Sequence, residues 1–290
     1  MIMSFNRIVP RALALITAAL LLVSLTSCGD KTGTGKVSVP NVTVYSDKEL
    51  SEPDSTPDES AEPATQAPTE ADPPENGLAV YNDGNKRYFI NGEAQKDGIV
   101  GSDEDGFYYA DADGLINTKY CDGINVDGND WCIIEGKATQ VFSEEDKTLL
   151  AACKAIGKCT DTTMDRAQKL RASFDYIKTA YLEGVLHNPP YHEMDWPVVC
   201  ANDLFIYGKG DCYSYGAAYA YYAKAIGYEE AYACNSGGHG GAEVEGKYYD
   251  PEWDMHHNEY NHFGVAPEDD CDVNYTRGLA PGEAWMRIKV

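Results

Sequence analysis

A cysteine that follows two glycines has the sequence context in which a nucleophile is expected. The segment reads Gly208-Lys-Gly-Asp-Cys212, and a run of aromatic and apolar residues continues to Ile226 before Gly227. Asp211 is a good N-cap, which places Cys212 in the first turn of a helix that Gly227 closes. Unpaired backbone N–H groups and the positive end of the helix dipole favour a thiolate there. A buried structural cysteine is the alternative interpretation of a lone residue.

A histidine and an aspartate further along the chain could complete the chemistry. Glu245-Gly246 predicts a two-residue hairpin loop between His239 and Asp250. In the register that this loop sets, the two residues are diagonal neighbours on one face of the hairpin, about 7–8 Å apart. One imidazole nitrogen could then meet Asp250 while the other meets the sulfur of Cys212. The three would act as nucleophile, base and orienting acid, and the backbone amide of Cys212 could face a developing oxyanion.

Together these residues resemble the transglutaminase-like superfamily, over roughly residues 146–253. Its members carry a Gly-x-Cys at a helix start, a His beginning a strand, and an Asp-Pro followed by Trp-Asp. The resemblance implies a catalytic triad of Cys212, His239 and Asp250 and acyl transfer or hydrolysis at amide or peptide bonds through a cysteine thioester, without a cofactor. It also implies an α+β, papain-like core. The matching segments here are Gly210-Asp-Cys212, His239, Asp250-Pro251 and Trp253-Asp254.

The sequence departs from that family beside the histidine. Gly240 and Gly241 stand where an Ala-Trp pair is common, so we expect a more open wall next to His239. The substrate, and the choice between water and an amine as the group that resolves the thioester, stay open at this stage.

The elements around these residues are expected to be helical from residue 143 onward, and we assign 143–290 to the transglutaminase-like domain. A three-and-four spacing of apolar residues predicts a helix with Gly184 as its C-cap. An earlier helix is expected to stop near Gly157, and residues 188–210, which contain three prolines, are expected to be mostly loop. The apolar residues that predict the helix ending before Gly184 are Ala167, Leu170, Phe174, Ile177 and Tyr181.

Residues 77–142 are expected to form β-hairpins. Gly92, Gly114 and Gly136 recur every 22 residues, each after aromatic or apolar residues, and Asn91-Gly92 and Asp113-Gly114 are tight-turn signals. The pattern resembles the aromatic-glycine repeats of bacterial cell-wall-binding modules, which implies glycan contact by residues 77–142. The alternative is a small β domain that packs on its neighbour.

The first residues are typical of an export signal. Arg7 and Arg11 precede an apolar run from Ala12 to Leu25 that is too short for a comfortable membrane span. The run ends in Leu25-Thr-Ser-Cys28-Gly29, which resembles the lipobox of bacterial lipoproteins. The resemblance implies a signal peptide over residues 1–27, a lipidated Cys28 and an extracytoplasmic protein anchored to the bacterial cell membrane. An ordinary secretory signal is the alternative. Residues 28–76, acidic and rich in Pro, Ser and Thr, are expected to be a disordered linker.

Composition narrows the partners. The chain has 290 residues with 47 Asp and Glu against 23 Lys and Arg, a net charge of −24, which argues against nucleic-acid binding. The resemblance to the transglutaminase-like superfamily implies a protein or peptide substrate, wall peptides included. A catalytically inactive cell-surface module that binds glycan or protein is the alternative function, and a different Cys-His wall hydrolase is a third.

Two further expectations concern metal and disulfides. No ligand spacing connects His256, His257 and His262, so we expect a surface loop there and no metal. Export would permit disulfides, and Cys121 with Cys132 is the preferred pair because both lie on candidate neighbouring strands.

Overall fold

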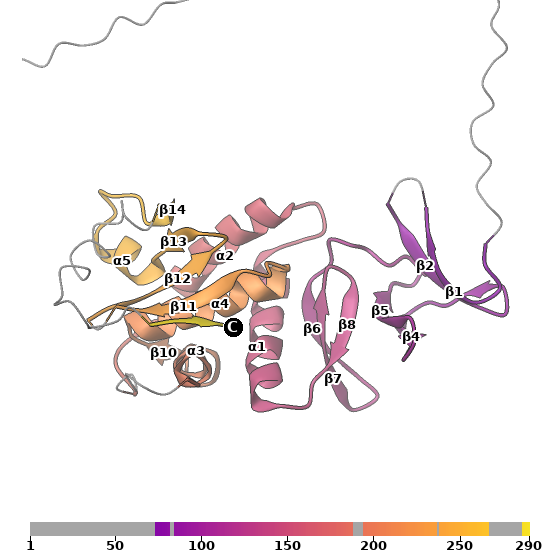
Figure 1. The fold of residues 1–290 in the computed structure, drawn as a ribbon, viewed down its shortest axis with the longest axis horizontal. Coiled ribbons are helices and arrows are strands. Elements are labelled where there is room, and N and C mark those ends of the chain that lie inside the picture. Colours follow the sequence, from indigo (N-terminus) through magenta and orange to yellow (C-terminus); the bar gives the residue numbers. More distant parts are fainter. Residues whose placement is uncertain (1–72, 82–83, 188–193, 237, 267–285) are drawn as a thin grey trace, which may run out of the picture. The chain divides into compact units, whose positions relative to one another are not determined.

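A computed structural model describes residues 73–81, 84–187, 194–236, 238–266 and 286–290. The predicted signal peptide, Cys28 and all but the last four residues of the predicted linker lie outside the described residues. The described residues belong to one compact unit, Thr65–Val290, of mixed α/β structure with antiparallel sheets (Figure 1). Within them, no helix combines the length and the apolar character needed to cross a membrane. The helices are α1 (Glu144–Cys159), α2 (Arg166–Ala180), α3 (Trp196–Tyr207), α4 (Cys212–Ile226) and α5 (Pro251–His256).

One antiparallel sheet forms the platform for the C-terminal half. Its order is β14-β13-β12-β11-β15. Glu245 and Gly246, both with positive φ, make the two-residue loop between β12 and β13, so the predicted hairpin loop is confirmed. The strands are β11 (Ala231–Asn235), β12 (Gly240–Val244), β13 (Lys247–Tyr249), β14 (Phe263–Val265) and β15 (Met286–Lys289).

Helix α4 is the centre of the core. It packs on β11 and β12 and is also in contact with α1, α2 and α3 (Figure 1). A helix that is apolar on every side must be buried, and its tyrosines Tyr215, Tyr219, Tyr221 and Tyr222 are fully buried. Both predicted ends of this helix are confirmed: Asp211 is the N-cap, and Gly227 is a left-handed C-cap with φ 111°.

Glycines allow α4 to approach the sheet closely. A Cβ on Gly216 would lie 2.6 Å from backbone atoms of Gly241, and one on Gly240 would lie 2.5 Å from the Cα of Tyr213. Backbone cannot yield at such distances, so side chains are excluded at these positions. The expectation of a more open wall beside His239 is therefore wrong, because the space above Gly240 is filled by the first turn of α4.

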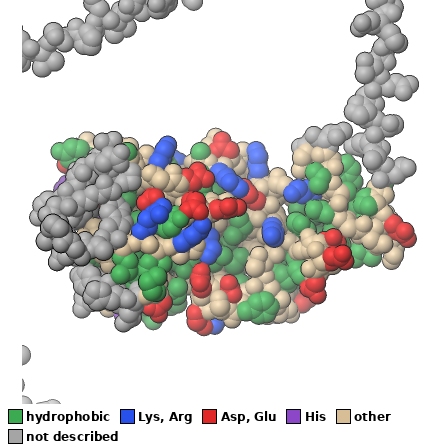
Figure 2. Space-filling view, viewed as in Figure 1, with side chains coloured by type: hydrophobic (Ala, Val, Ile, Leu, Met, Phe, Trp, Pro, Cys, Tyr) green, Lys and Arg blue, Asp and Glu red, His purple; other side chains and the backbone are tan. Residues whose placement is uncertain are grey.

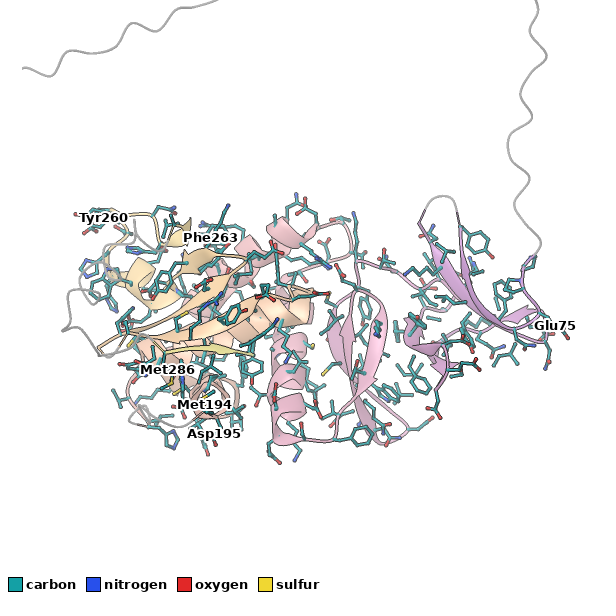
Figure 3. The ribbon with its side chains drawn as sticks, in the orientation of Figure 1. Glu75, Met194, Asp195, Tyr260, Phe263 and Met286 are labelled. Atoms are coloured by element: carbon teal, nitrogen blue, oxygen red, sulfur yellow. The ribbon has the colours of Figure 1, made fainter. Side chains whose placement is uncertain are left out.

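Packing of aromatic rings joins α2 to the same sheet. Phe263 on β14 meets the ring of Phe174 at 5.1 Å and that of Tyr249 at 5.1 Å, both edge to face (Figure 3). Tyr219 of α4 meets Phe174 at 5.4 Å, again edge to face. Edge-to-face pairs are favourable beyond the area that they bury, so this cluster fixes α2 and α4 against β13 and β14.

Two local predictions of the helical region are wrong. The segment expected to be loop contains α3, because Pro197 occupies the first turn, where proline is tolerated. Gly184 is not the C-cap of α2, which ends at Ala180 with Tyr181 as its cap. The chain instead enters β9 (Leu182–Glu183), which pairs in parallel with β10 (Lys209–Gly210).

The residues before α1 form two further antiparallel sheets. The first has the order β1-β2-β3 and the second β4-β5-β8-β7-β6. The predicted turn at Asn91-Gly92 joins β2 to β3, and Glu135-Gly136 joins β7 to β8 in the same conformation. The strands are β1 (Gly77–Val80), β2 (Lys86–Ile90), β3 (Glu93–Ala94), β4 (Gly98–Ser102), β5 (Gly106–Ala110), β6 (Asp122–Val126), β7 (Asn129–Ile134) and β8 (Lys137–Gln140).

Strand β6 packs directly on α1. A Cβ on Gly123 would lie 2.8 Å from the carbonyl oxygen of Leu150, and one on Gly157 would lie 2.5 Å from a carboxylate oxygen of Asp122.

Acidic and basic side chains are interspersed on the face of the molecule shown in Figure 2. A role of these strands in glycan binding stays a prediction.

The preferred disulfide is wrong: Cys121 and Cys132 are both free thiols. Cys132 lies opposite Gly123 in the β6–β7 ladder, so Cys121 is displaced from it by two residues along the strand. Two residues span about 7 Å of strand, which exceeds the reach of a disulfide.

Candidate active site

Cys212 is the first residue of α4 and is partly exposed. The carboxylate of Asp211 accepts the backbone N–H of Ser214 at 3.2 Å, which closes the first turn. Gly210 is required behind it, because an added Cβ would lie 2.3 Å from the Cβ of Ser214. The short parallel pair of β9 and β10 places Glu183 opposite Gly210, two residues before the cysteine. The sulfur is thus held at a helix start and is partly open to solvent.

His239 immediately precedes β12 and is 5% exposed. The backbone N–H and the hydroxyl of Ser236 both donate to its carbonyl oxygen, at 3.0 and 2.9 Å. The ring of Trp253 meets the imidazole edge to face at 5.2 Å. The backbone and the ring of His239 are therefore both held in place by their surroundings.

Asp250 is fully buried, and its carboxylate contacts the imidazole of His239 directly. Its Oδ2 lies 2.5 Å from Nε2 of His239, while its Oδ1 accepts the backbone N–H of Trp253 at 2.9 Å. The ladder between β12 and β13 ends at Ala242 and Tyr249, so Asp250 leaves the sheet and becomes the N-cap of α5. The same carboxylate therefore orients the imidazole through one oxygen and caps helix α5 through the other.

His262 supports Asp250 from the neighbouring segment. Its carbonyl oxygen accepts the backbone N–H of Asp250 at 3.0 Å, and its Nε2 lies 3.2 Å from the carbonyl oxygen of His257. The ring is fully buried. The expectation of a surface loop is thus wrong for His262, because this residue anchors the loop to the site.

The imidazole of His239 connects the carboxylate to the sulfur. Since Nε2 faces Asp250, Nδ1 is the nitrogen left to face Cys212, whose proximity also acts on the pKa of His239. Burial lowers the pKa of His239, but the charge and the hydrogen bond of Asp250, followed by the contacts with Cys212, outweigh it. The net result is a pKa well above the usual value for histidine, which favours an imidazolium beside the sulfur.

The three residues selected from the sequence are thus brought together in space. Models of known protein families, curated proteins and solved structures give no match to this chain. The geometry of the site is therefore the basis for any functional conclusion.

The structure adds two carboxylates that sequence reasoning missed. Burial raises the pKa of Glu252, and the charges of Asp250 and Glu183 add to that effect. Tyr215 is affected by the same two glutamates: burial, then Glu183 and Glu252, raise its pKa to about 12. The only sequence signal that could have identified Glu252 is its position two residues after Asp250. Glu183 gave no sequence signal, because only the pairing of β9 with β10 brings it here.

A second His–Asp pair lies on the α3 side of α4 and was also missed. Nδ1 of His187 lies 2.6 Å from Oδ1 of Asp203, whose Oδ2 accepts the hydroxyl of Ser214 at 3.4 Å. Burial raises the pKa of Asp203. The sequence gave no warning of this pair, because the segment that carries Asp203 was expected to be loop.

The first arrangement can perform nucleophilic chemistry. A thiol at a helix start, an imidazole close to it and a buried carboxylate behind the imidazole are the parts of a nucleophile–base–orienter set. The backbone N–H of Cys212 lies in the first turn of α4, where the amides have no intrahelical acceptor.

Two overlapping groups in the described residues have metal-ligating atom types within 4.8 Å of one another: Glu183, Glu252 and His256, and His239, Asp250 and Glu252.

Proposed function

We propose that this protein is a cysteine enzyme that transfers or hydrolyses acyl groups at amide or peptide bonds through a thioester on Cys212. The observation that carries the proposal is the position of His239, which is hydrogen-bonded to the buried Asp250 and close enough to Cys212 for that residue to raise its pKa. The same residues carry the resemblance to the transglutaminase-like superfamily. A papain-like core, with the cysteine helix packed on the sheet that bears the histidine, is part of this proposal.

The first half of the reaction would form the thioester. The thiol proton of Cys212 already lies on Nδ1 of His239 in the imidazolium–thiolate pair, and the thiolate sulfur attacks the carbonyl carbon of the substrate. The backbone N–H of Cys212 stabilises the oxyanion of the tetrahedral intermediate. The imidazolium then gives its proton to the leaving amine as the C–N bond breaks, and Asp250 stabilises the charged ring throughout.

The second half would release the acyl group. Water or a second amine attacks the thioester carbon, and the neutral imidazole takes the proton of the attacking group. The C–S bond breaks, which restores the thiolate of Cys212 beside the imidazolium of His239. Water gives hydrolysis and an amine gives a cross-link, and the residues that we describe serve both outcomes equally.

We further propose that the enzyme acts outside the cell. The basic, apolar and cysteine parts of residues 1–29 support export and lipid attachment at Cys28. The substrate would then be a protein or a wall peptide, presented to a domain that the acidic linker holds away from the membrane.

Trapping of the acyl-enzyme tests the proposed chemistry. The purified protein is incubated with a peptide library, quenched in acid and analysed by mass spectrometry for an acyl adduct on Cys212. We expect an adduct in the wild type and none at this position in Cys212→Ala. A wild type that forms no adduct at Cys212 across the library would contradict the proposal.

Alkylation separates the enzyme from a silent binding module. Iodoacetamide is expected to modify Cys212 faster than a free thiol at neutral pH, and this advantage is expected to be lost in His239→Ala. A rate equal to that of a free thiol, together with unchanged glycan or protein binding in Cys212→Ser, would favour the binding module. Incubation with purified peptidoglycan then shows whether wall peptides are released.

A further inference from the structure

Beside the proposed active site lie two glutamates and a histidine whose ligand atoms converge. Glu183 comes from β9, and Glu252 and His256 come from α5. Nε2 of His256 lies 2.7 Å from Oε1 of Glu183 and 3.7 Å from Oε1 of Glu252. The spacing of four residues within α5 puts Glu252 and His256 on one helix face. We propose that these three side chains form a binding site for a divalent transition-metal ion of the zinc class.

The donor set fits such an ion. One imidazole nitrogen and two carboxylate oxygens, with further positions left to water, are ligands that zinc accepts. Around a tetrahedral ion with bonds of about 2.1 Å, ligand atoms lie roughly 3.4 Å apart. The separations of 2.7 and 3.7 Å in the structure bracket that value. Small rotations of side chains that are 44–47% exposed would therefore complete the site.

The charges around the three residues also favour a cation. The ligand atoms of Glu183 and Glu252 lie within 4.8 Å of each other, and Asp250 adds a further carboxylate near Glu252. In the described residues, no ion pair joins a lysine or arginine to either glutamate, and their ion-pair partner is the imidazole of His256. The nearby Lys178 is engaged by Asp254 at 2.7 Å. A divalent ion would add positive charge to a negative group that only histidines compensate among the described residues.

The grouping differs from the one that chain order suggests. His256, His257 and His262 are close in sequence, yet the ring of His262 is buried against the carbonyl oxygen of His257. The ring of His257 stacks near Trp253 at 4.4 Å. The structure thus selects His256 alone and supplies its partners from β9 and from one turn earlier in α5.

Metal titration of the full chain tests the site. Co²⁺ is the probe, followed by its visible absorption, and Zn²⁺ binding is measured by calorimetry. We expect one equivalent to bind, and at least about tenfold weaker binding in His256→Asn and in Glu183→Gln. His257→Asn is the matched control, because it changes the neighbouring histidine, and it should bind as the wild type does. Circular dichroism confirms that each variant is folded.

Two results would overturn the site. One is the absence of binding, or binding that His256→Asn leaves unchanged. The other is a thiolate-to-cobalt band that disappears in Cys212→Ser, since the ion would then sit on the sulfur and not on the three side chains. Because all of these readouts report binding, they do not depend on the proposed enzymatic activity.

Occupation of the site is expected to block Cys212. Glu252 belongs both to this group and to the group formed with His239 and Asp250, so a bound ion would lie beside the imidazole. We expect saturating Zn²⁺ to slow alkylation of Cys212 by at least about tenfold in the wild type and to have no effect in His256→Asn. Unchanged alkylation in a wild type that binds the ion would refute inhibition and leave the binding site standing.

Discussion

Two His–Asp pairs lie near the start of α4, and they differ in the order of their contacts. His239 and Asp250 are 2.5 Å apart, and His187 and Asp203 are 2.6 Å apart. In the first pair the imidazole lies between the carboxylate and the sulfur of Cys212. In the second the carboxylate lies between the imidazole and the hydroxyl of Ser214. A base must touch the nucleophile that it activates, so the first pair has the contact order that the proposed catalysis requires and the second does not.

Burial separates the two pairs as clearly as contact order does. The side chain of His239 is 7% exposed and that of His187 is 49% exposed. Contacts with Asp250 and Cys212 overcome burial and raise the pKa of His239, whereas burial itself raises the pKa of Asp203. One site therefore favours a charged imidazole and the other disfavours a charged carboxylate.

Substitution of Cys212 in the first site and of Ser214 in the second gives the largest expected contrast. We expect Cys212→Ala to lower turnover of a trapped peptide substrate by at least about 10⁴-fold, because the thioester cannot form. Ser214→Ala should leave turnover within about threefold and lose one side-chain hydrogen bond, about 1 kcal/mol of stability. Steady-state rates and urea unfolding measure the two effects. Comparable losses of turnover in both variants would erase the distinction between the sites.

The carboxylates give the next contrast. In Asp250→Asn the amide still fills the space, but it cannot stabilise an imidazolium, so we expect turnover to fall about 10³-fold. Asp203→Asn retains an oxygen acceptor for His187 and removes a charge that burial disfavours. It should therefore leave turnover unchanged and stability within about 1 kcal/mol. Stability measured between pH 4 and 8 provides the check on the second variant.

The pH dependence of that stability has a defined sign. Because burial raises the folded-state pKa of Asp203 above its unfolded value, its contribution is present below about pH 4 and is lost as pH rises through the folded-state value. The wild type should thus lose stability relative to Asp203→Asn as pH increases from that region. A difference that grows in the opposite direction would show that His187 keeps the carboxylate charged.

The histidines differ in their effect on the sulfur. A raised pKa keeps His239 charged at neutral pH, and that charge stabilises a thiolate at Cys212. We expect His239→Ala to slow iodoacetamide alkylation about 100-fold at pH 6–7. The difference should shrink as pH rises through the folded-state pKa of His239, where the imidazolium is lost. His187→Ala should follow the wild-type profile across the whole range, and a parallel slowing would mean that both histidines act on Cys212.

Short-range signals account for what the sequence could predict. Asp211, Gly227 and the loop at Glu245-Gly246 act within a few residues, and each was found where its local chemistry indicated. The prolines of residues 188–210 misled because a proline in the first helical turn favours a helix, as Pro197 does in α3.

Contacts between distant segments account for what the sequence could not predict. Glu183 reaches the site only through the pairing of β9 with β10, and His262 supports Asp250 only through a backbone hydrogen bond. Neither leaves a spacing pattern in the chain. The approach of α4 to β12 belongs to the same class, because Gly240 suggested open space until the helix was seen to fill it.

The approach of α4 to β12 gives the last prediction, which concerns stability and reactivity together. A Cβ on Gly240 would lie 2.5 Å from the Cα of Tyr213, so Gly240→Ala must push the first turn of α4 away from β12. We expect a loss of about 2 kcal/mol in the free energy of unfolding, with alkylation of Cys212 slowed toward the rate of His239→Ala. Gly238→Ala is the matched control, since nothing lies within 4 Å of its added Cβ. It should change stability by less than about 0.5 kcal/mol. If Gly240→Ala instead kept both the stability and the alkylation rate of the wild type, the close contact of helix and strand would not be what brings Cys212 to His239.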